Sequence, residues 1–161
     1  MSYRIDLDNA AFIQAGQSIT VAAANAHLQP SVAKAVACRV GAAGDELRLV
    51  LVRSRAAALL QDIAASWRLA VMVSQPSTHR SLQLKGRVLA IEPVAADELP
   101  DIQRQMDHFA SDLRLIGHVA QFAPTFLAFD RDDLLGIRVG VESGFHQTPG
   151  PGAGRRLDAG A

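Results

Sequence analysis

The segment between residues 81 and 88 constrains the fold of this chain more than any other, because its side chains alternate between apolar and polar. The apolar face carries Leu82, Leu84 and Val88. The opposite face carries hydroxyl, amide and cationic groups, from Ser81, Gln83, Lys85 and Arg87. Residues 75–78, just before it, have the composition of a turn. The pattern therefore predicts a β-strand that is buried on one side only.

The exposed side of this strand and the turn before it are rich in donors and positive charge. The charged residues are Arg80, Lys85 and Arg87, and the neutral donors are Ser77, Thr78, Ser81 and Gln83. Such a set could hold a phosphate or a carboxylate through charge-assisted hydrogen bonds. The alternative is a solvated strand face with ordinary surface charge.

The net charge of the chain means that any anion must be captured locally. Lysine and arginine number 16, as do aspartate and glutamate, so the formal net charge is zero. A neutral chain has no global field that attracts nucleic acid or an anionic membrane. We therefore expect neither nucleic acid nor a membrane as a partner.

Five further segments have strand patterns. They cover residues 18–24, 32–40, 46–52, 69–74 and 137–141. Residues 69–74 are almost continuously apolar, which is typical of a strand covered on both faces. Together with residues 81–88 these segments predict a mainly β domain.

Residues 32–40 combine one ordinary strand face with one unusually smooth face. Alternation places Val32, Lys34, Val36, Cys38 and Val40 on the first face, and Ala33, Ala35, Ala37 and Arg39 on the second. Three alternating alanines let a flat ring system or a second subunit approach the backbone closely. The alternative is tight packing of a helix or strand of the same chain.

Three segments predict helices, at residues 10–15, 54–67 and 97–116. The second has an amphipathic stripe, and Ser54 is a plausible N-cap. Arg53 and Arg55 flank this serine, and the free N–H groups of a helix start favour an anion. A phosphate could bind there; in the alternative, both arginines face solvent.

Length and composition predict one domain, residues 1–143, followed by a tail. A chain of 161 residues with 49% hydrophobic residues can bury one core. Residues 144–161 are rich in proline and glycine, so we expect a loop or a disordered segment. The single cysteine, Cys38, excludes an intramolecular disulfide. Since no signal peptide or membrane-length apolar segment is visible either, we expect a cytoplasmic protein.

These motifs, in this order, resemble the pyridoxamine 5′-phosphate oxidase-like group of split-barrel proteins that bind flavin mononucleotide (FMN). The resemblance rests on Pro-Ser-Thr-His-Arg at residues 76–80 running into Gln-Leu-Lys-Gly at residues 83–86, after an apolar strand and before a long helix. It extends over the order of elements from residue 17 to 141. It implies a mainly β fold with flanking helices, a six-stranded antiparallel split barrel, FMN as the cofactor, and a homodimer with the flavin at the subunit boundary.

The resemblance also implies which residues hold the cofactor. In the oxidases, a strand with an arginine near its start, a Ser-Arg-Lys turn and an Arg-Gln strand hold the flavin phosphate and ring. The corresponding residues here are Lys34, Ala35, Val36, Ala37, Arg39, Arg53, Ser54, Arg55, Ser77, Thr78, His79, Arg80, Gln83 and Lys85. Ala56 stands where the oxidases have the lysine of the turn.

Two functions from different classes follow. The first is an FMN-dependent oxidoreductase of unknown substrate, in which the hydride chemistry belongs to the flavin and no catalytic residue can be named. The second is a non-catalytic split-barrel protein that has lost the flavin or binds another flat anionic ligand, such as a deazaflavin or haem. The C-terminal substrate motif of the oxidases has no counterpart in residues 142–161, so we expect no vitamin B6 oxidase activity.

Two weaker patterns predict no site. Ser77 and His79 are too close on one turn to act as a nucleophile and its base. His108 and Asp112 lie four residues apart on a charged helix face, where a solvated pair is more common than a metal site. We expect no metal.

Overall fold

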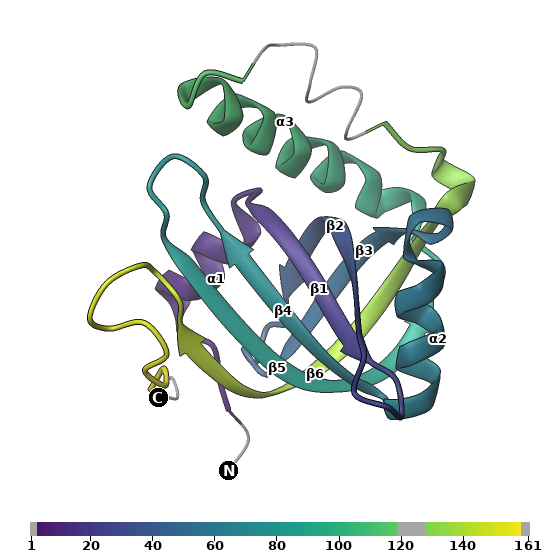
Figure 1. Ribbon diagram of the computed structural model, residues 1–161. Helices are drawn as coiled ribbons and strands as arrows, with labels where there is room; N and C mark the ends of the chain where they lie inside the picture. Colours follow the sequence, from purple (N-terminus) through teal and green to yellow (C-terminus); the bar gives the residue numbers. More distant parts are fainter. Residues whose placement is uncertain (1–2, 119–127, 159–161) are drawn as a thin grey trace.

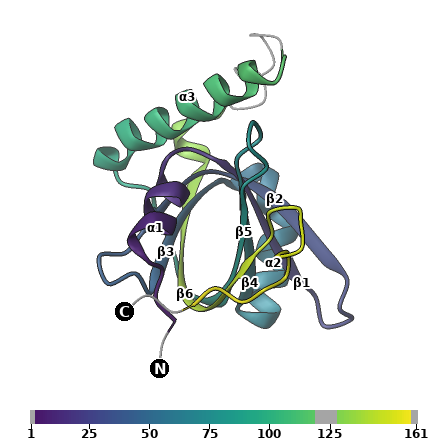
Figure 2. The ribbon, with the colours of Figure 1, turned by 90° about the vertical axis from the view of Figure 1, so that its left-hand side faces the viewer.

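The computed structural model describes residues 3–118 and 128–158 and contains a closed barrel of six strands, all neighbours antiparallel. Around the barrel the order is β1, β2, β3, β6, β5, β4. The strands are β1 (Ser18–Ala24), β2 (Pro30–Val40), β3 (Glu46–Val52), β4 (Arg68–Ser74), β5 (Ser81–Glu92) and β6 (Leu134–His146). Figure 2 shows the ring that they form. The predicted fold, mainly β with flanking helices around a six-stranded antiparallel split barrel, is confirmed.

Alternating side chains fill the barrel, as the sequence pattern requires. Leu82, Leu84 and Val88 of β5 are buried in it, as predicted. Helices α1 (Leu7–Gln14) and α2 (Ala57–Ser66), which lie on opposite sides of the barrel in Figure 1, add apolar residues to the same core. The helix α1 begins earlier than predicted because Asp6 is its N-cap.

Helix α3 (Leu99–Leu115) packs on the outside of the barrel (Figure 2). Its apolar stripe contains Ile102, Met106, Phe109 and Leu113. These side chains pack against the outward residues of β2, β3 and β6, which are Ala37, Val50, Val52 and Leu134. A 3₁₀ turn, η2 (Ala96–Glu98), precedes the helix, and Pro100 lies in its first turn as predicted.

The predicted smooth alanine face of β2 is wrong, because the strand contains a β-bulge. The register with β3 shifts between Ala35 and Ala37, and the extra residue moves every later side chain to the other face. Ala35 therefore lies in the barrel core, whereas Ala37 packs beneath α3. Val36 packs against the α3 cluster, and Arg39 forms an ion pair with Asp101 of α3. The packing alternative is the correct one.

The predicted N-cap of α2 is also wrong. A 3₁₀ turn, η1 (Arg53–Ala56), leads into α2, whose N-cap is Ala56, and that residue makes no side-chain cap bond. Ser54 instead donates its backbone N–H and its hydroxyl to the carboxylate of Asp133. The end of β3 is thus tied to η3 (Arg131–Asp133), the turn before β6.

Two strands differ from their predicted form. In β4, Leu69, Val71 and Val73 are buried, but Ala70 and Met72 on the other face are half-buried, so this strand is not covered on both faces. The last strand is longer than predicted and ends at His146, inside the expected tail. The tail then folds back on β6 through backbone hydrogen bonds at Gly144 and His146, and Leu157 is buried. The predicted link over residues 118–129 lies mostly outside the described residues.

Candidate functional site

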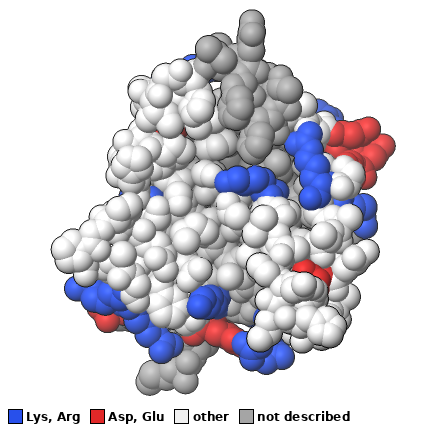
Figure 3. All heavy atoms as spheres, viewed as in Figure 1, with Lys and Arg blue, Asp and Glu red and all other residues white. Residues whose placement is uncertain are grey.

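One outer face of the barrel has no helix of residues 3–118 and 128–158 packed against it. It is formed by β1, β4 and the first half of β5, which lie at the front of Figure 1, together with the adjoining edges of β2 and β6. We name this surface the open face; its residues are Ser18, Thr20, Ala22, Lys34, Ala70, Met72, Ser74, Ser81, Gln83, Lys85 and Phe145. Apart from the two exposed lysines, these side chains are half-buried in one chain. Figure 3 shows that this side of the molecule is largely uncharged, with few positive side chains inside it.

Lys34 lies on this face with its ammonium held in a defined position. Its Nζ donates hydrogen bonds of 2.8 Å to Ser18 Oγ and 2.8 Å to Thr20 Oγ1. It forms no ion pair with any residue in the described ranges 3–118 and 128–158. Partial burial lowers the pKa of its ammonium group. Since an ammonium has three hydrogens, one remains for an anionic ligand.

Hydroxyl groups extend from Lys34 across the neighbouring strands. Ser18 is opposite Ser74 in the register of β1 and β4, and Ser74 is opposite Ser81 in that of β4 and β5. Ser81 Oγ donates a 2.9 Å hydrogen bond to Ser74 Oγ. These three serines form a polar row at one edge of the open face, and each hydroxyl can donate or accept.

The turn η1 begins beside Lys34. Leu51 of β3 is opposite Ala35 of β2, so the chain leaves β3 next to Lys34, and η1 contacts β2. Arg53 of this turn is exposed and forms no ion pair within the described chain. Arg55 donates a 2.6 Å hydrogen bond to the carbonyl of Ala128. Asp133 accepts hydrogen bonds from both donors of Ser54. Of the phosphate ligands predicted around this turn, Lys34 and Arg53 are therefore the better placed.

The turn between β4 and β5 has its own set of partners. Arg80 lies over the ring of Phe12 at 4.2 Å and donates a 3.0 Å hydrogen bond to Asn9 Oδ1, so this side chain is directed toward α1. Ser77 donates its N–H and its hydroxyl to the buried carboxylate of Asp112 in α3. The carboxylate of Asp112 is therefore part of a buried contact and not the solvated group that the sequence predicted.

The other members of this turn are exposed. Thr78 Oγ1 donates to Gln75 Oε1 at 2.9 Å, and His79 has a left-handed backbone conformation with φ 61°. In Figure 1 this turn and η1 lie on opposite sides of the view. The structure therefore does not bring the two predicted basic turns together within one chain.

Ser18 and Thr20 are not among the site residues predicted from the sequence. Alternation placed Ile19, Val21 and Ala23 of this segment in the core, which left its hydroxyl residues on the outer face. Their partner could be found only by pairing β1 with β2, where Thr20 is opposite Lys34. The cross-strand pair, more than either strand alone, makes the candidate site.

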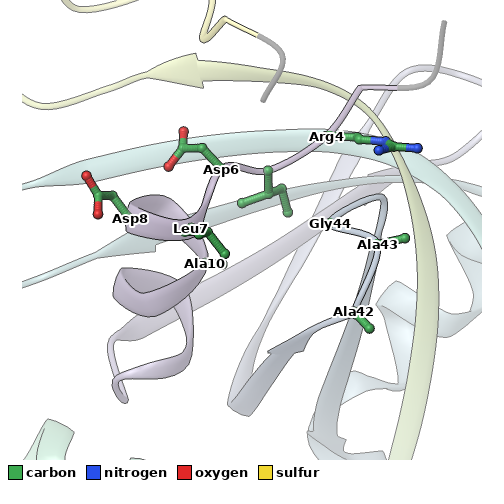
Figure 4. A pocket seen from close by; sticks show the side chains of 10 residues that line it. Arg4, Asp6, Leu7, Asp8, Ala10, Ala42, Ala43 and Gly44 are labelled. Carbon is green, nitrogen blue, oxygen red and sulfur yellow. The ribbon is translucent and has the colours of Figure 1, made fainter. Parts of the chain in front are cut away.

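A separate hollow of about 570 Å³ lies between the N-terminal segment and the β2–β3 turn. Figure 4 shows its lining, with Asp6 and Asp8 beside α1 and Arg4 away from them. Both Asp6 oxygens accept hydrogen bonds from Asn9, so this carboxylate is already used to cap α1. None of the predicted site residues lines this hollow. The open face therefore remains the stronger candidate.

Two further features bear on the class of site. Across residues 3–118 and 128–158, no three His, Cys, Asp or Glu side chains group as metal ligands would. Among the helices of that same part of the chain, none is long and apolar enough to cross a membrane.

Comparison with known proteins supports the fold. No family model and no curated protein matches this sequence. An F420 reductase of known structure has a TM-score of 0.58 at 19% sequence identity, over 87% of this chain and 98% of that chain. HupZ of Group A Streptococcus has a TM-score of 0.53 at 15% identity, over 93% and 99% of the two chains.

A third structure, a candidate pyridoxamine 5′-phosphate oxidase of Lactobacillus delbrueckii, has a TM-score of 0.55 at 9% identity, over 90% of this chain and 99% of that one. At these identities the likeness shows the fold alone. The chain therefore has the split-barrel fold of the pyridoxamine 5′-phosphate oxidase-like proteins.

Proposed function

We propose that this protein binds FMN on the open face of the barrel and acts as an FMN-dependent oxidoreductase. The observation that carries the proposal is Lys34, an ammonium held by two hydroxyls and without an acidic partner in the described chain. A phosphate satisfies such a group, and the neighbouring Arg53 adds a second charge. Each charge-assisted hydrogen bond contributes about 1.5–3 kcal/mol.

The surface next to Lys34 suits a flat ring. In the strand register Thr20 and Ala22 of β1 are opposite Met72 and Ala70 of β4. These side chains are small or flexible and half-buried, so they leave a low platform of four residues between the charged groups. An isoalloxazine ring on this platform buries apolar area that is exposed in one chain.

FMN, when bound, supplies the hydride-transfer chemistry, and this chain binds and orients it. The hydroxyls of Ser18 and Thr20 fix the Lys34 ammonium, which reduces the ordering cost of binding a phosphate. The amide of Gln83 lies in the same cross-strand row, opposite Met72, and can donate to the edge of a ring. No side chain of the open face is assigned an acid or base role.

The vitamin B6 oxidase reaction is not part of this proposal. The C-terminal residues after β6 form a turn that returns to β6 through the bridge between Phe145 and Arg156, and they contain no tryptophan. Hydride transfer requires a substrate held close to the flavin, so a protein without the substrate-binding residues should catalyse this reaction far more slowly. We expect FMN-loaded protein to give no turnover with pyridoxamine 5′-phosphate. Steady formation of pyridoxal 5′-phosphate at about 1 per second, a rate typical of enzymes, would contradict this.

A homodimer in the cytoplasm is also proposed. The open face is largely uncharged (Figure 3), and a second subunit would close over a flavin bound on the half-buried Ala22, Ala70 and Met72, so that the flavin lies at the subunit boundary. A sedimentation experiment at micromolar concentration should show a dimer. A single monomeric species would contradict this part of the proposal.

The second candidate is a non-catalytic protein that binds a deazaflavin or haem or has lost its cofactor. It is favoured by the turn η1, where Ala56 is buried and Asp133 already satisfies the donors of Ser54. A structure of similar fold is an F420 reductase. Titration with F420 and with haem tests this candidate in the same format as FMN.

The test of the proposal compares FMN with riboflavin, which has the same ring but no phosphate. The wild type should bind FMN more tightly, and Lys34→Met should weaken FMN binding by about tenfold or more while riboflavin binding is unchanged. Arg87→Met is the matched control, because Arg87 is an exposed cation of β5 that already faces Glu142 at 3.7 Å. Equal loss of FMN affinity in both variants, or none in Lys34→Met, would refute the phosphate assignment.

A further inference from the structure

Lys34 and Lys85, the two lysines of this chain, lie on the same open face. Three strand pairings connect them: Lys34 is opposite Thr20, Thr20 is opposite Met72, and Lys85 is opposite Ala70 in the next row of β4. Three strand spacings and an offset of two residues along the strands separate the two lysine backbones, which places them about 16 Å apart. Lys34 Nζ is held by Ser18 and Thr20, and Lys85 Nζ lies near Phe145, so one phosphate group is too small to contact both ammonium groups.

Lys85, like Lys34, has no acidic partner in the part of the chain that the structure describes. Neither lysine forms an ion pair with a residue in the described ranges, whereas the neighbouring Arg68 and Arg87 both pair with Glu142, at 3.2 and 3.7 Å. The acidic group nearest along the sheet is therefore already shared by two arginines. The positive charge of Lys85 is left for a ligand.

Aromatic and amide groups surround Lys85. Its Nζ lies 5.1 Å from the centre of the Phe145 ring, a cation–π distance. Phe145 is opposite Gln83, whose Oε1 lies 3.5 Å from Nε2 of Gln147. The tail fixes this arrangement, since Gln147 N–H donates to the Ser81 carbonyl and Phe145 bridges to Arg156. These groups form a wall at the end of the platform opposite Lys34.

We infer that Lys85, Phe145 and Gln83 form a second anion subsite, which binds the carboxylate or phosphate of a planar substrate. The inference rests on the proposed function, in which the FMN phosphate lies at Lys34. The substrate class follows from the chemistry of the groups: the ammonium pairs with an anion, the amide donates to it, and the ring of Phe145 contacts a flat, apolar part.

The two-lysine composition gives a direct test. Incorporation of ¹³C-lysine into the full chain labels Lys34 and Lys85 alone and keeps all three hydrogens of each ammonium, so each site gives its own NMR signal. Phenyl phosphate and benzoate serve as probes for the second subsite, and FMN for the first. We expect FMN to shift the Lys34 signal, and the probes to shift the Lys85 signal saturably, with or without FMN.

Matched variants assign the effect. Lys85→Met should weaken phenyl phosphate binding, followed by the ring resonances of the probe, by about tenfold or more, whereas Arg87→Met should change it by less than about twofold. If FMN shifts neither lysine but the probes still bind at Lys85, the proposed cofactor site fails and the anion subsite stands.

Three results would overturn the second subsite. The first is the absence of a saturable shift at Lys85 with either probe. The second is competition between phenyl phosphate and FMN at Lys34. The third is a Lys85 signal that responds to the probes in the monomer and not in the dimer, which would show that the second subunit covers this lysine.

Discussion

Replacing Gln105 by leucine should destabilise the fold strongly, because the amide of this side chain bonds backbone groups at the edge of strand β2. The strand β2 continues past the start of β1, so Cys38 has a strand partner on one side only, Leu49 of β3. Gln105 Oε1 accepts from Cys38 N–H at 3.0 Å, and Gln105 Nε2 donates to the Cys38 carbonyl at 3.0 Å. Gln105 is 1% exposed, so water does not reach these groups.

The expected magnitude follows from the two orphaned groups. Each buried backbone group without a partner costs about 1–3 kcal/mol, so the loss of both amide bonds costs about 2–6 kcal/mol. The burial of a leucine offsets about 1.5–3 kcal/mol of this. We therefore expect the free energy of unfolding to fall by about 2 kcal/mol, a large share of the typical stability of about 5–15 kcal/mol.

Urea denaturation at a fixed protein concentration measures this loss. Gln103→Leu is the matched control, because Gln103 is exposed and its Nε2 donates to Asp107 Oδ1 of the same helix at 2.8 Å. The control should change the free energy of unfolding by less than about 0.5 kcal/mol. A Gln105→Leu variant as stable as that control would refute the view that α3 completes the edge of β2.

Three further predictions concern the rest of the fold. Gly136→Ala should lower the free energy of unfolding by about 1–3 kcal/mol, because a Cβ there would lie 2.2 Å from the Arg48 guanidinium carbon. Gly152→Ala, with open space around it, is the control in the same denaturation assay. The hydrogen bond from Arg48 lowers the pKa of Glu98 in the folded protein. The stability that this bond contributes is present above the ordinary pKa of a glutamate and should be lost as the pH falls through the lowered pKa. Glu98→Gln should therefore make the free energy of unfolding less dependent on pH in the acid range. Leu157→Ala should lower the free energy of unfolding by about 2–5 kcal/mol, because this tail residue is 5% exposed.

Each of these has a clear contrary result. Equal stability of the two glycine variants would mean that Arg48 adjusts without loss. An unchanged pH dependence in the glutamine variant would show that other carboxyl groups dominate acid unfolding. A Leu157→Ala variant as stable as the wild type would show that the tail does not contribute to the stability of the fold.

Strands with clear alternation could be predicted from the sequence almost to the residue. The strands β1 and β3 have the predicted bounds, since their apolar and polar residues alternate and turn residues follow. The β-bulge in β2 could not be predicted, because the residues around it, Ala35 to Cys38, are all apolar and a shifted register leaves no mark on the pattern.

Features of the site that depend on distant residues were also beyond the sequence. Ser54 had the local signature of an N-cap, but its partner Asp133 is 79 residues away. Arg80 and Arg55 looked alike as cations after turns, yet α1 holds the first and the carbonyl of Ala128 holds the second. Lys34 was predicted for its charge, whereas its value to a ligand comes from the hydroxyls of β1.

A crystal structure of the protein with FMN tests the central claim most directly. We predict electron density for the flavin on the open face, with a phosphate oxygen at hydrogen-bonding distance, about 3 Å, from Lys34 Nζ. The ring should lie against Thr20 and Met72. A phosphate bound at Arg80 or in the hollow beside Arg4, with Lys34 free of ligand, would contradict the account.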